Sequence, residues 1–148
     1  MLTPLAWDSA FFGLRLARLS LDTLDAAAAT AAAEAAREQR LDGVSLLLAA
    51  ADARGILAAQ EVGFRLVDVR VSLERTAGTP APSLPDLPLV RPHRLDDLPA
   101  LEAIAERAHR DTRFWRDPRF PPARAAELYR TWIRKECEGG ADRVLVAV

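Results

Sequence analysis

Hydrophobic and polar positions fall into short, distinct blocks over the first part of the 148-residue chain. Near-alternation of leucine with polar residues over 14–21 predicts a strand. An alanine-rich block over 26–40, with Asp22 or Thr23 placed to cap it, predicts a helix. The continuous apolar run over 44–48 predicts a second strand, covered on both faces.

The pattern of hydrophobic and polar positions predicts further elements up to residue 75. Asp52 is placed to cap a second helix, which would end at Gly63. Apolar side chains then alternate over 64–73 and predict a third, longer strand. We therefore expect a small β-α-β-α-β domain over residues 1–75.

A different pattern follows. Residues 76–88 hold four prolines and no hydrophobic period, which is typical of a linker. The remaining segment, 89–148, is expected to form the order strand-helix-helix-strand. Its predicted elements are a strand over 89–92, a helix over 97–109 capped by Asp96, an irregular loop over 111–121, a long helix starting at Pro122, and a strand over 143–148.

Composition excludes several classes of protein. Half the residues are hydrophobic, 28% are charged and the net charge is -1, which is typical of a globular protein and gives no field that would attract nucleic acid. No apolar run reaches the length of a membrane helix, and the N-terminus has no pattern of a secretory signal. We therefore expect a cytoplasmic protein that binds neither nucleic acid nor membrane. The single cysteine, Cys137, excludes an internal disulfide and a multi-cysteine metal site, and we expect it to be a packing residue.

Several stretches, taken in order, resemble the GNAT superfamily of N-acetyltransferases and, within it, the enzymes that acetylate a nucleotide-linked amino sugar. The stretches that carry the resemblance are Leu5–Gly13, Val62–Val67, Val90–Pro92, Asp96–Leu101, Thr112–Phe114, Asp117–Phe120 and Leu128–Ile133.

This resemblance implies an α/β fold in which a small N-terminal domain precedes the first half of a GNAT domain. It implies acetyl-CoA as co-substrate and a small-molecule amine as acceptor, such as a nucleotide-linked amino sugar. A homodimer is compatible with it.

The chain departs from the family at the cofactor loop. GNAT enzymes bind the pyrophosphate of acetyl-CoA on backbone N–H groups of a glycine-rich loop that opens a helix. The seven glycines here never occur as Gly-x-Gly. We therefore expect no cofactor-binding residue in this chain, expect the loop to lie beyond Val148, and expect these 148 residues to be an inactive N-terminal part.

Arginines recur every third residue from Arg107 to Arg119, interleaved with aromatic residues. Guanidinium groups beside aromatic rings suit a nucleotide-sugar diphosphate. From the resemblance we expect Arg113 and Phe114 to bind the acceptor substrate. The alternative is a solvated charged loop, neutralised by Asp111 and Asp117.

Other candidates receive structural interpretations. His109 is interpreted as a surface residue at a helix end rather than a base or phosphate contact, and no role is expected for His93. Tyr129 and Trp132 lie on an apolar helical stripe and are interpreted as core. No catalytic residue and no metal site is assigned.

Two classes of function remain open at this stage. The first is an N-acetyltransferase whose cofactor-binding half is missing from this chain. The second is a noncatalytic α/β module that binds a ligand or a partner.

Overall fold

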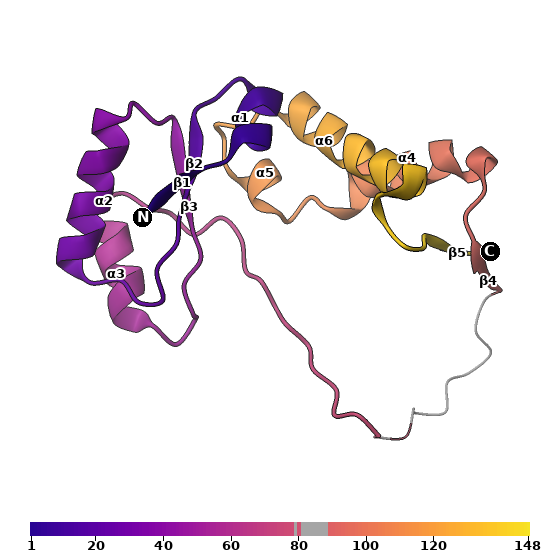
Figure 1. Ribbon diagram of the computed structural model, residues 1–148, viewed down its shortest axis with the longest axis horizontal. Coiled ribbons are helices and arrows are strands. Elements are labelled where there is room, and N and C mark those ends of the chain that lie inside the picture. The colour runs from indigo at the N-terminus through magenta and orange to yellow at the C-terminus, as the bar shows by residue number, and fades with distance from the viewer. Residues whose placement is uncertain (79, 81–88) are drawn as a thin grey trace. The chain divides into compact units, whose positions relative to one another are not determined.

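A computed structural model describes residues 1–78, 80 and 89–148 as two compact units, Met1–Leu66 and Val67–Val148 (Figure 1). Most of the predicted linker lies outside the described residues. The elements in chain order are β1 (Leu2–Pro4), α1 (Ala6–Phe12), β2 (Leu16–Leu19), α2 (Ala26–Glu38), β3 (Gly43–Leu46), α3 (Ala53–Glu61), β4 (Val90–Pro92), η1 (Leu95–Asp97), α4 (Leu98–Ala108), α5 (Arg113–Arg116), α6 (Pro122–Lys135), η2 (Glu136–Gly140) and β5 (Leu145–Ala147).

The N-terminal unit is built on a three-stranded sheet in the order β1-β2-β3. β1 runs antiparallel to β2, with Leu2 opposite Leu19, and β3 runs parallel to β2, with Leu16 opposite Gly43. A parallel pair requires a crossover connection, and α2 supplies it. β2 is the central strand, and three of its four residues are buried.

α2 and α3 pack together beside this sheet (Figure 1). The carboxylate of Asp25 caps α2 by accepting the Ala28 N–H at 2.7 Å, and that of Asp52 caps α3 by accepting the Gly55 N–H at 2.9 Å. Gly63 follows α3 with φ of 97°, a left-handed conformation that glycine adopts at little cost, and so ends the helix as predicted. The buried core of the unit consists of Leu19, Leu24, Ala29, Ala58 and Ala59.

The strand predicted over residues 64–73 is wrong. Leu66, Val69 and Leu73 are 79%, 67% and 92% exposed, and no described strand pairs with this segment. Alternation of apolar side chains favours a strand, but a strand is stable only beside a neighbour that satisfies its backbone. The sheet takes its third strand instead from β1, a three-residue element too short to predict, and the helix α1 follows it, where the sequence pattern gave no element.

Two details of the same unit also differ from expectation. The cap of α2 is Asp25 rather than Asp22 or Thr23. β3 lies at an edge of the described sheet with half-buried residues, so it is not covered on both faces.

α4 and α6 form the framework of the C-terminal unit. Glu106 pairs with Arg130 at 2.7 Å, and Glu102 pairs with Arg134 at 2.6 Å. The earlier α4 residue thus meets the later α6 residue, so the two helices run antiparallel. Leu128 is completely buried. The buried apolar residues of the unit are Ala105, Phe114, Ala125, Ala126, Leu128 and Tyr129.

A two-stranded antiparallel sheet completes this unit. β4 pairs with β5, with Arg91 opposite Val146, so strands form within both segments where they were predicted, 89–92 and 143–148. α6 begins at Pro122, as predicted, because proline suits the first helical turn. It ends before η2, where Gly139 has φ of 108°.

Two predictions in this unit are corrected. Asp96 does not cap the first helix. The turn η1 precedes α4 instead, and the carboxylate of Asp97 accepts the Arg94 N–H at 2.7 Å. The loop expected over residues 111–121 contains the short helix α5. Its turns are closed by the N–H groups of Arg116 and Asp117, which donate to the carbonyl oxygens of Thr112 and Arg113.

Among the residues that the structure describes, none of the helices has both the length and the apolar character that crossing a membrane requires.

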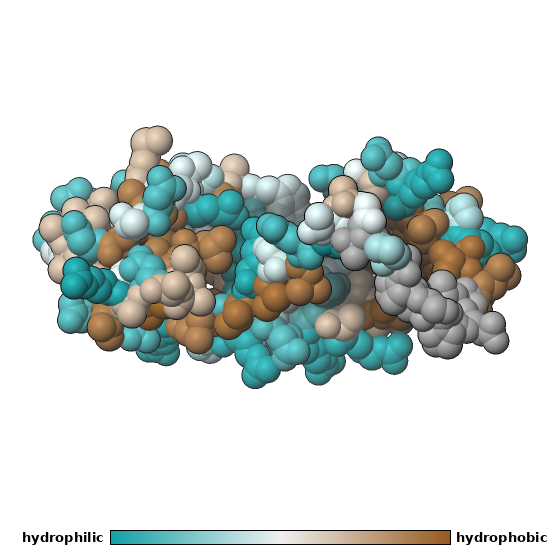
Figure 2. Space-filling view, turned by 90° about the horizontal axis from the view of Figure 1, so that it is seen from below, coloured by the Kyte–Doolittle hydropathy of each residue, from teal (hydrophilic) through white to brown (hydrophobic). Residues whose placement is uncertain are grey.

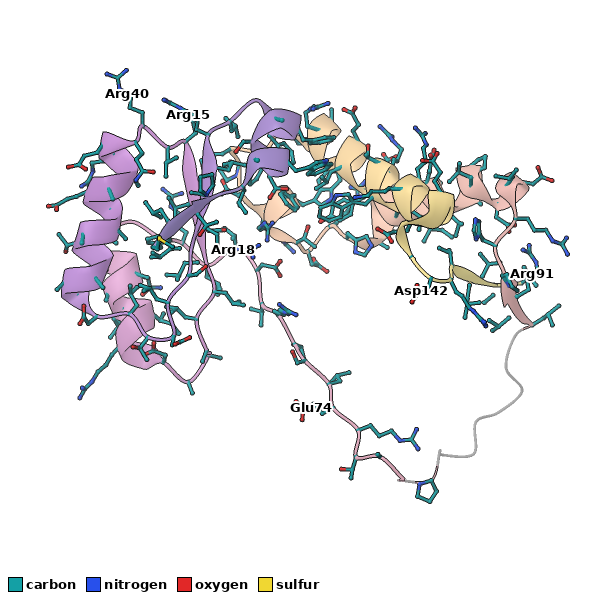
Figure 3. The ribbon with its side chains drawn as sticks, viewed as in Figure 1. Arg15, Arg18, Arg40, Glu74, Arg91 and Asp142 are labelled. Atoms are coloured by element: carbon teal, nitrogen blue, oxygen red, sulfur yellow. The ribbon has the colours of Figure 1, made fainter. Side chains whose placement is uncertain are left out.

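Asp97 provides a test of the contacts that hold β4 to η1. Arg91, labelled in Figure 3, donates to both carboxylate oxygens of Asp97, at 2.7 and 2.9 Å, and these bonds together with the Arg94 N–H hold the pKa of Asp97 well below its usual range. A carboxyl group whose pKa is lowered on folding stabilises the fold at pH values above its usual pKa. This contribution to stability is lost as the pH falls toward the pKa that the group has in the folded state. Asp97→Asn should therefore lower the thermal unfolding midpoint at neutral pH, with a difference that shrinks below about pH 4.

Circular dichroism melts over a range of pH measure this effect. Asp96→Asn is the matched control and should leave the midpoint unchanged. The hydrogen bond to the Arg94 N–H and the ion pair with Arg91 that hold this turn are made by Asp97 and not by Asp96. A parent protein and an Asp97→Asn variant with the same midpoint at neutral pH would contradict the stabilising role.

Candidate functional site

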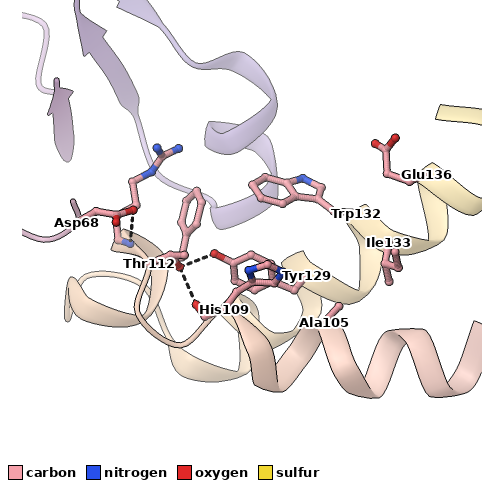
Figure 4. Close-up of a pocket in the computed structure, with 10 residues that line it drawn as sticks. Asp68, Ala105, His109, Thr112, Tyr129, Trp132, Ile133 and Glu136 are labelled. Carbon is pink, nitrogen blue, oxygen red and sulfur yellow. Dashed lines mark hydrogen bonds between the residues drawn. The ribbon is translucent and has the colours of Figure 1, made fainter. Parts of the chain in front are cut away.

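A hollow of about 410 Å³ opens on the C-terminal unit beside α4, α5 and α6 (Figure 4). Both residues predicted to bind a substrate, Arg113 and Phe114, line it. The other lining residues are Asp68, Ala105, His109, Thr112, Tyr129, Trp132, Ile133 and Glu136.

Aromatic rings form much of the wall. The ring of Tyr129 lies edge to face with Trp132 at 5.5 Å between centroids, and Phe114 lies edge to face with Trp132 at 5.9 Å. The imidazole of His109 stacks on Tyr129 at 4.8 Å. Phe114 and Tyr129 are buried, whereas Trp132 is 36% exposed and presents ring surface to a ligand.

A chain of hydrogen bonds holds this wall in place. The hydroxyl of Thr112 donates to the carbonyl oxygen of His109 at 3.0 Å. Since that hydroxyl has a single proton, the phenol of Tyr129, which contacts it closely, donates to its oxygen (Figure 4). Burial raises the pKa of Tyr129, while the bond with Thr112 and the charge of Arg113 act in the opposite direction. The hydroxyl therefore stays protonated and fixes the end of α4 to α6.

Charged groups surround the aromatic wall. The guanidinium carbon of Arg113 lies 4.4 Å from the centroid of the Phe114 ring, and the Arg113 N–H points to a carboxylate oxygen of Asp68 at 3.4 Å. Asp68 and Glu136 lie at opposite ends of the hollow in Figure 4. A cation and two carboxylates around ring surfaces suit a small ligand that carries a ring, an amine and an anionic group.

Arg113 differs from the other four arginines of the three-residue repeat, none of which lines the hollow. Their contacts are Arg107 with the carbonyl oxygen of Ala103 at 3.0 Å, Arg110 over the ring of Trp115 at 5.1 Å, Arg116 with Asp111 at 2.8 Å, and Arg119 with Asp117 at 2.5 Å. The charged-loop interpretation is correct for Arg116 and Arg119, whose charges are neutralised as expected.

Sequence reasoning missed three residues of the hollow. Tyr129 is buried as expected for core, but its hydroxyl belongs to the hollow, and Trp132 is half-exposed there rather than in the core. His109 is an exposed residue at the end of α4, as expected, and it also stacks on the wall. The available signal was the three-residue spacing of Tyr129 and Trp132, which places two polar-edged rings on one face of α6.

The helix N-termini of this chain do not fit the pyrophosphate of acetyl-CoA. Such a site needs several backbone N–H groups directed at the phosphates. The carboxylates of Asp25 and Asp52 already occupy the N-termini of α2 and α3, and α6 begins with a proline, which has no N–H. η1 leads directly into α4, whose second residue is Pro99, so its first turn also lacks one N–H. The described N-termini of α2, α3, α4 and α6 are thus each reduced by a cap or a proline in the N–H groups that they offer to an anion.

Metal and thiol chemistry also lack support. The described residues contain no group of three or more histidine, cysteine or carboxylate side chains that could hold a metal ion. Burial and nearby carboxylates raise the pKa of Cys137, which disfavours the reactive thiolate.

Comparison with known proteins gives one informative similarity. Over 139 residues, which are 94% of this chain, the sequence is 31% identical to a protein named dTDP-fucosamine acetyltransferase from Escherichia coli O6:H1 (strain CFT073). The matched region is 57% of that relative, so the chain spans little more than half its length. No family model matches the chain. The expected resemblance to an acetyltransferase is thus supported over nearly the whole chain, and membership of the GNAT superfamily stays a prediction.

Tyr129 provides a direct test of the wall, because it is the only tyrosine in the chain. Its phenolate absorbance should appear at a higher pH in the folded protein than the value of about 10 that is usual for tyrosine, since burial disfavours the charged form. Ultraviolet titration of the folded and the denaturant-unfolded protein measures both midpoints. Tyr129→Phe should abolish the signal, and equal midpoints in the two states would show that the phenol is not buried in this wall.

Proposed function

We propose that this chain carries the acceptor-binding part of a GNAT-type N-acetyltransferase, and that the hollow binds an amine-bearing, nucleotide-linked sugar. The observation that carries the proposal is the presence of Arg113 on Phe114 beside the ring of Trp132 and the carboxylates of Asp68 and Glu136. The similarity to a protein named dTDP-fucosamine acetyltransferase supports the substrate class.

Each group has a chemical task in this proposal. The guanidinium of Arg113 binds a phosphate oxygen of the diphosphate, and its stacking on Phe114 limits the orientations that it can adopt. The exposed face of Trp132 packs against the sugar or the base. A carboxylate at the rim, Asp68 or Glu136, attracts the acceptor's ammonium group.

An amine accepts an acetyl group only in its neutral form, because the lone pair that forms the new bond is occupied by a proton in the ammonium form. The ammonium must therefore lose a proton first, and the imidazole of His109 is exposed at the hollow as a group that can accept one. Acetyl-CoA does not fit the described helix N-termini, so we derive no step through it.

The first prediction concerns substrate binding. Arg113→Ala should weaken the affinity of the chain for a dTDP-linked amino sugar by about 10- to 150-fold, because a charge-assisted hydrogen bond contributes about 1.5–3 kcal/mol. Isothermal titration calorimetry measures the dissociation constants of the parent and the variant.

Arg116→Ala is the matched control, because Arg116 lies on the same short helix but pairs with Asp111 outside the hollow. Its dissociation constant should equal that of the parent. If both arginine variants bind as tightly as the parent, Arg113 does not contact the acceptor; if the parent shows no binding, the proposed site is wrong.

The second prediction concerns the co-substrate. The 148-residue chain should show no saturable binding of acetyl-CoA at micromolar concentrations, because its helix N-termini are capped by carboxylates or begin with proline. Calorimetric titration with acetyl-CoA tests this, and a micromolar dissociation constant would contradict it.

A second candidate function is a noncatalytic module that binds the same class of ligand. The poor fit of these helix N-termini to acetyl-CoA favours it. A chimera that joins this chain to the portion of the E. coli relative outside the matched region distinguishes the two. Acetylation of a dTDP-linked amino sugar by the chimera supports the acetyltransferase, whereas a folded chimera that binds both ligands without acetyl transfer supports the module.

A further inference from the structure

One face of α6 carries a stripe of residues that line the hollow. Its members are Tyr129, Trp132, Ile133 and Glu136, whose spacing in sequence places them on the same side of a helix. Glu136 directly follows α6 and has helical φ and ψ of -65° and -39°, so it continues the stripe. An apolar stripe with this spacing normally continues with an apolar residue. This one ends on a carboxylate.

The carboxylate of Glu136 stands out by its charge rather than by exposure. Figure 2 shows apolar surface, in brown, interspersed with polar surface, in teal, so exposed apolar side chains alone do not select a binding site. The last carbonyl groups of a helix carry a partial negative charge, and a carboxylate beside them lowers the stability of the helix. A residue that opposes local stability in this way is a candidate for a functional role.

The surroundings of Glu136 are negative, and its own charge is not neutralised. Burial raises the pKa of Cys137, the next residue, and four carboxylates including Glu136 raise it further. Two of the other three, Asp97 and Glu102, pair with arginines. Within the part of the chain that the structure describes, the carboxylate of Glu136 forms neither a hydrogen bond nor an ion pair. A cationic group of a ligand can therefore bind it without displacing a partner.

Asp68 lies at the opposite end of the hollow (Figure 4) and is already engaged. Its carboxylate receives the backbone N–H of Arg113 at 3.4 Å. Besides burial, the charges of Arg113 and Asp68 act in opposite directions on the pKa of Tyr129, so both charges lie at this end of the hollow. An ammonium group at Asp68 would have to compete with the cation of Arg113.

We propose that Glu136 binds the ammonium group of the acceptor, and that it thereby makes the hollow select a sugar with an amine over one with a hydroxyl group at the same position. This inference rests on the proposed function and names the specificity-determining residue of that site.

The stripe supplies two contacts for an ammonium group. The ammonium donates a charge-assisted hydrogen bond to the carboxylate of Glu136. Its positive charge also lies against the exposed ring of Trp132, which precedes Glu136 by one helical turn. A hydroxyl group carries no charge and gains neither contribution in full. With the diphosphate on Arg113, opposite charges at the two ends of the hollow orient the acceptor.

Two ligands that differ only in the amine test this assignment. The probes are a dTDP-linked amino sugar and the same dTDP-linked sugar with a hydroxyl group in place of the amine, each titrated calorimetrically into the 148-residue chain. The parent should bind the amino sugar more tightly by about 10-fold, because a hydrogen bond between charged groups is stronger than a neutral one. Glu136→Gln should remove most of this preference by weakening the binding of the amino sugar alone.

Thermal unfolding of the same variant separates recognition from a structural role. Glu136 opposes the helix dipole, so Glu136→Gln should unfold at the temperature of the parent or slightly above it. A variant that loses the preference and also unfolds at a lower temperature would show that the carboxylate supports the fold, and would overturn the assignment.

Glu138→Gln is the matched control, because Glu138 carries the same charge two residues further along the chain but does not line the hollow. Its preference for the amino sugar should equal that of the parent, as should that of Asp68→Asn. A parent that binds both ligands equally, or a preference that survives Glu136→Gln or is lost in Asp68→Asn, would overturn this inference and leave the proposed function intact. A parent that binds neither ligand would overturn both.

Discussion

The antiparallel packing of α4 against α6 is the constraint on which the candidate site depends. Ion pairs of Glu102 and Glu106 with arginines of α6 fix the register, and Leu128 fills the interior without exposed surface. Ala105 on α4 and the rings of Tyr129 and Trp132 on α6 line the same hollow.

That hollow is held by polar contacts as well as by packing. The phenol of Tyr129, the hydroxyl of Thr112 and the carbonyl of His109 form one chain from α6 to the end of α4. Hydrogen bonds are directional, so they fix the positions of these groups more precisely than apolar packing does. Phe114 is buried next to it and supports the guanidinium of Arg113, so the cation is positioned by the same framework.

The sequence predicted the elements whose stability is local. The alanine-rich helix α2, the proline start of α6 and the caps and glycines that end helices depend on a few adjacent residues. It failed where stability depends on a distant neighbour: residues 64–73 alternate like a strand but have no partner among the described strands, whereas β1 forms because β2 lies beside it.

The same distinction applies to the site. Arg113 and Phe114 were predicted from a local sequence resemblance, and the structure places both at the hollow. A tyrosine or tryptophan on an apolar helical stripe can be buried in the core or can line a hollow, depending on the residues of the neighbouring helix. Ala105 on α4 lines the same hollow as Trp132, but the two residues are too far apart in the sequence for a local pattern to connect them. Likewise, only the structure shows that Arg113 lines the hollow, whereas Arg116 and Arg119 pair with Asp111 and Asp117 outside it.

The central claim is that this hollow binds a nucleotide-linked amino sugar, and nuclear magnetic resonance of the 148-residue chain tests it most directly. In a titration with a dTDP-linked amino sugar, the account predicts saturable shifts of the backbone amides of Thr112, Phe114 and Tyr129 and of the indole N–H of Trp132. Amides of the N-terminal unit should move little. Saturable shifts confined to residues outside the hollow, or no shifts at concentrations well above micromolar, would contradict the account.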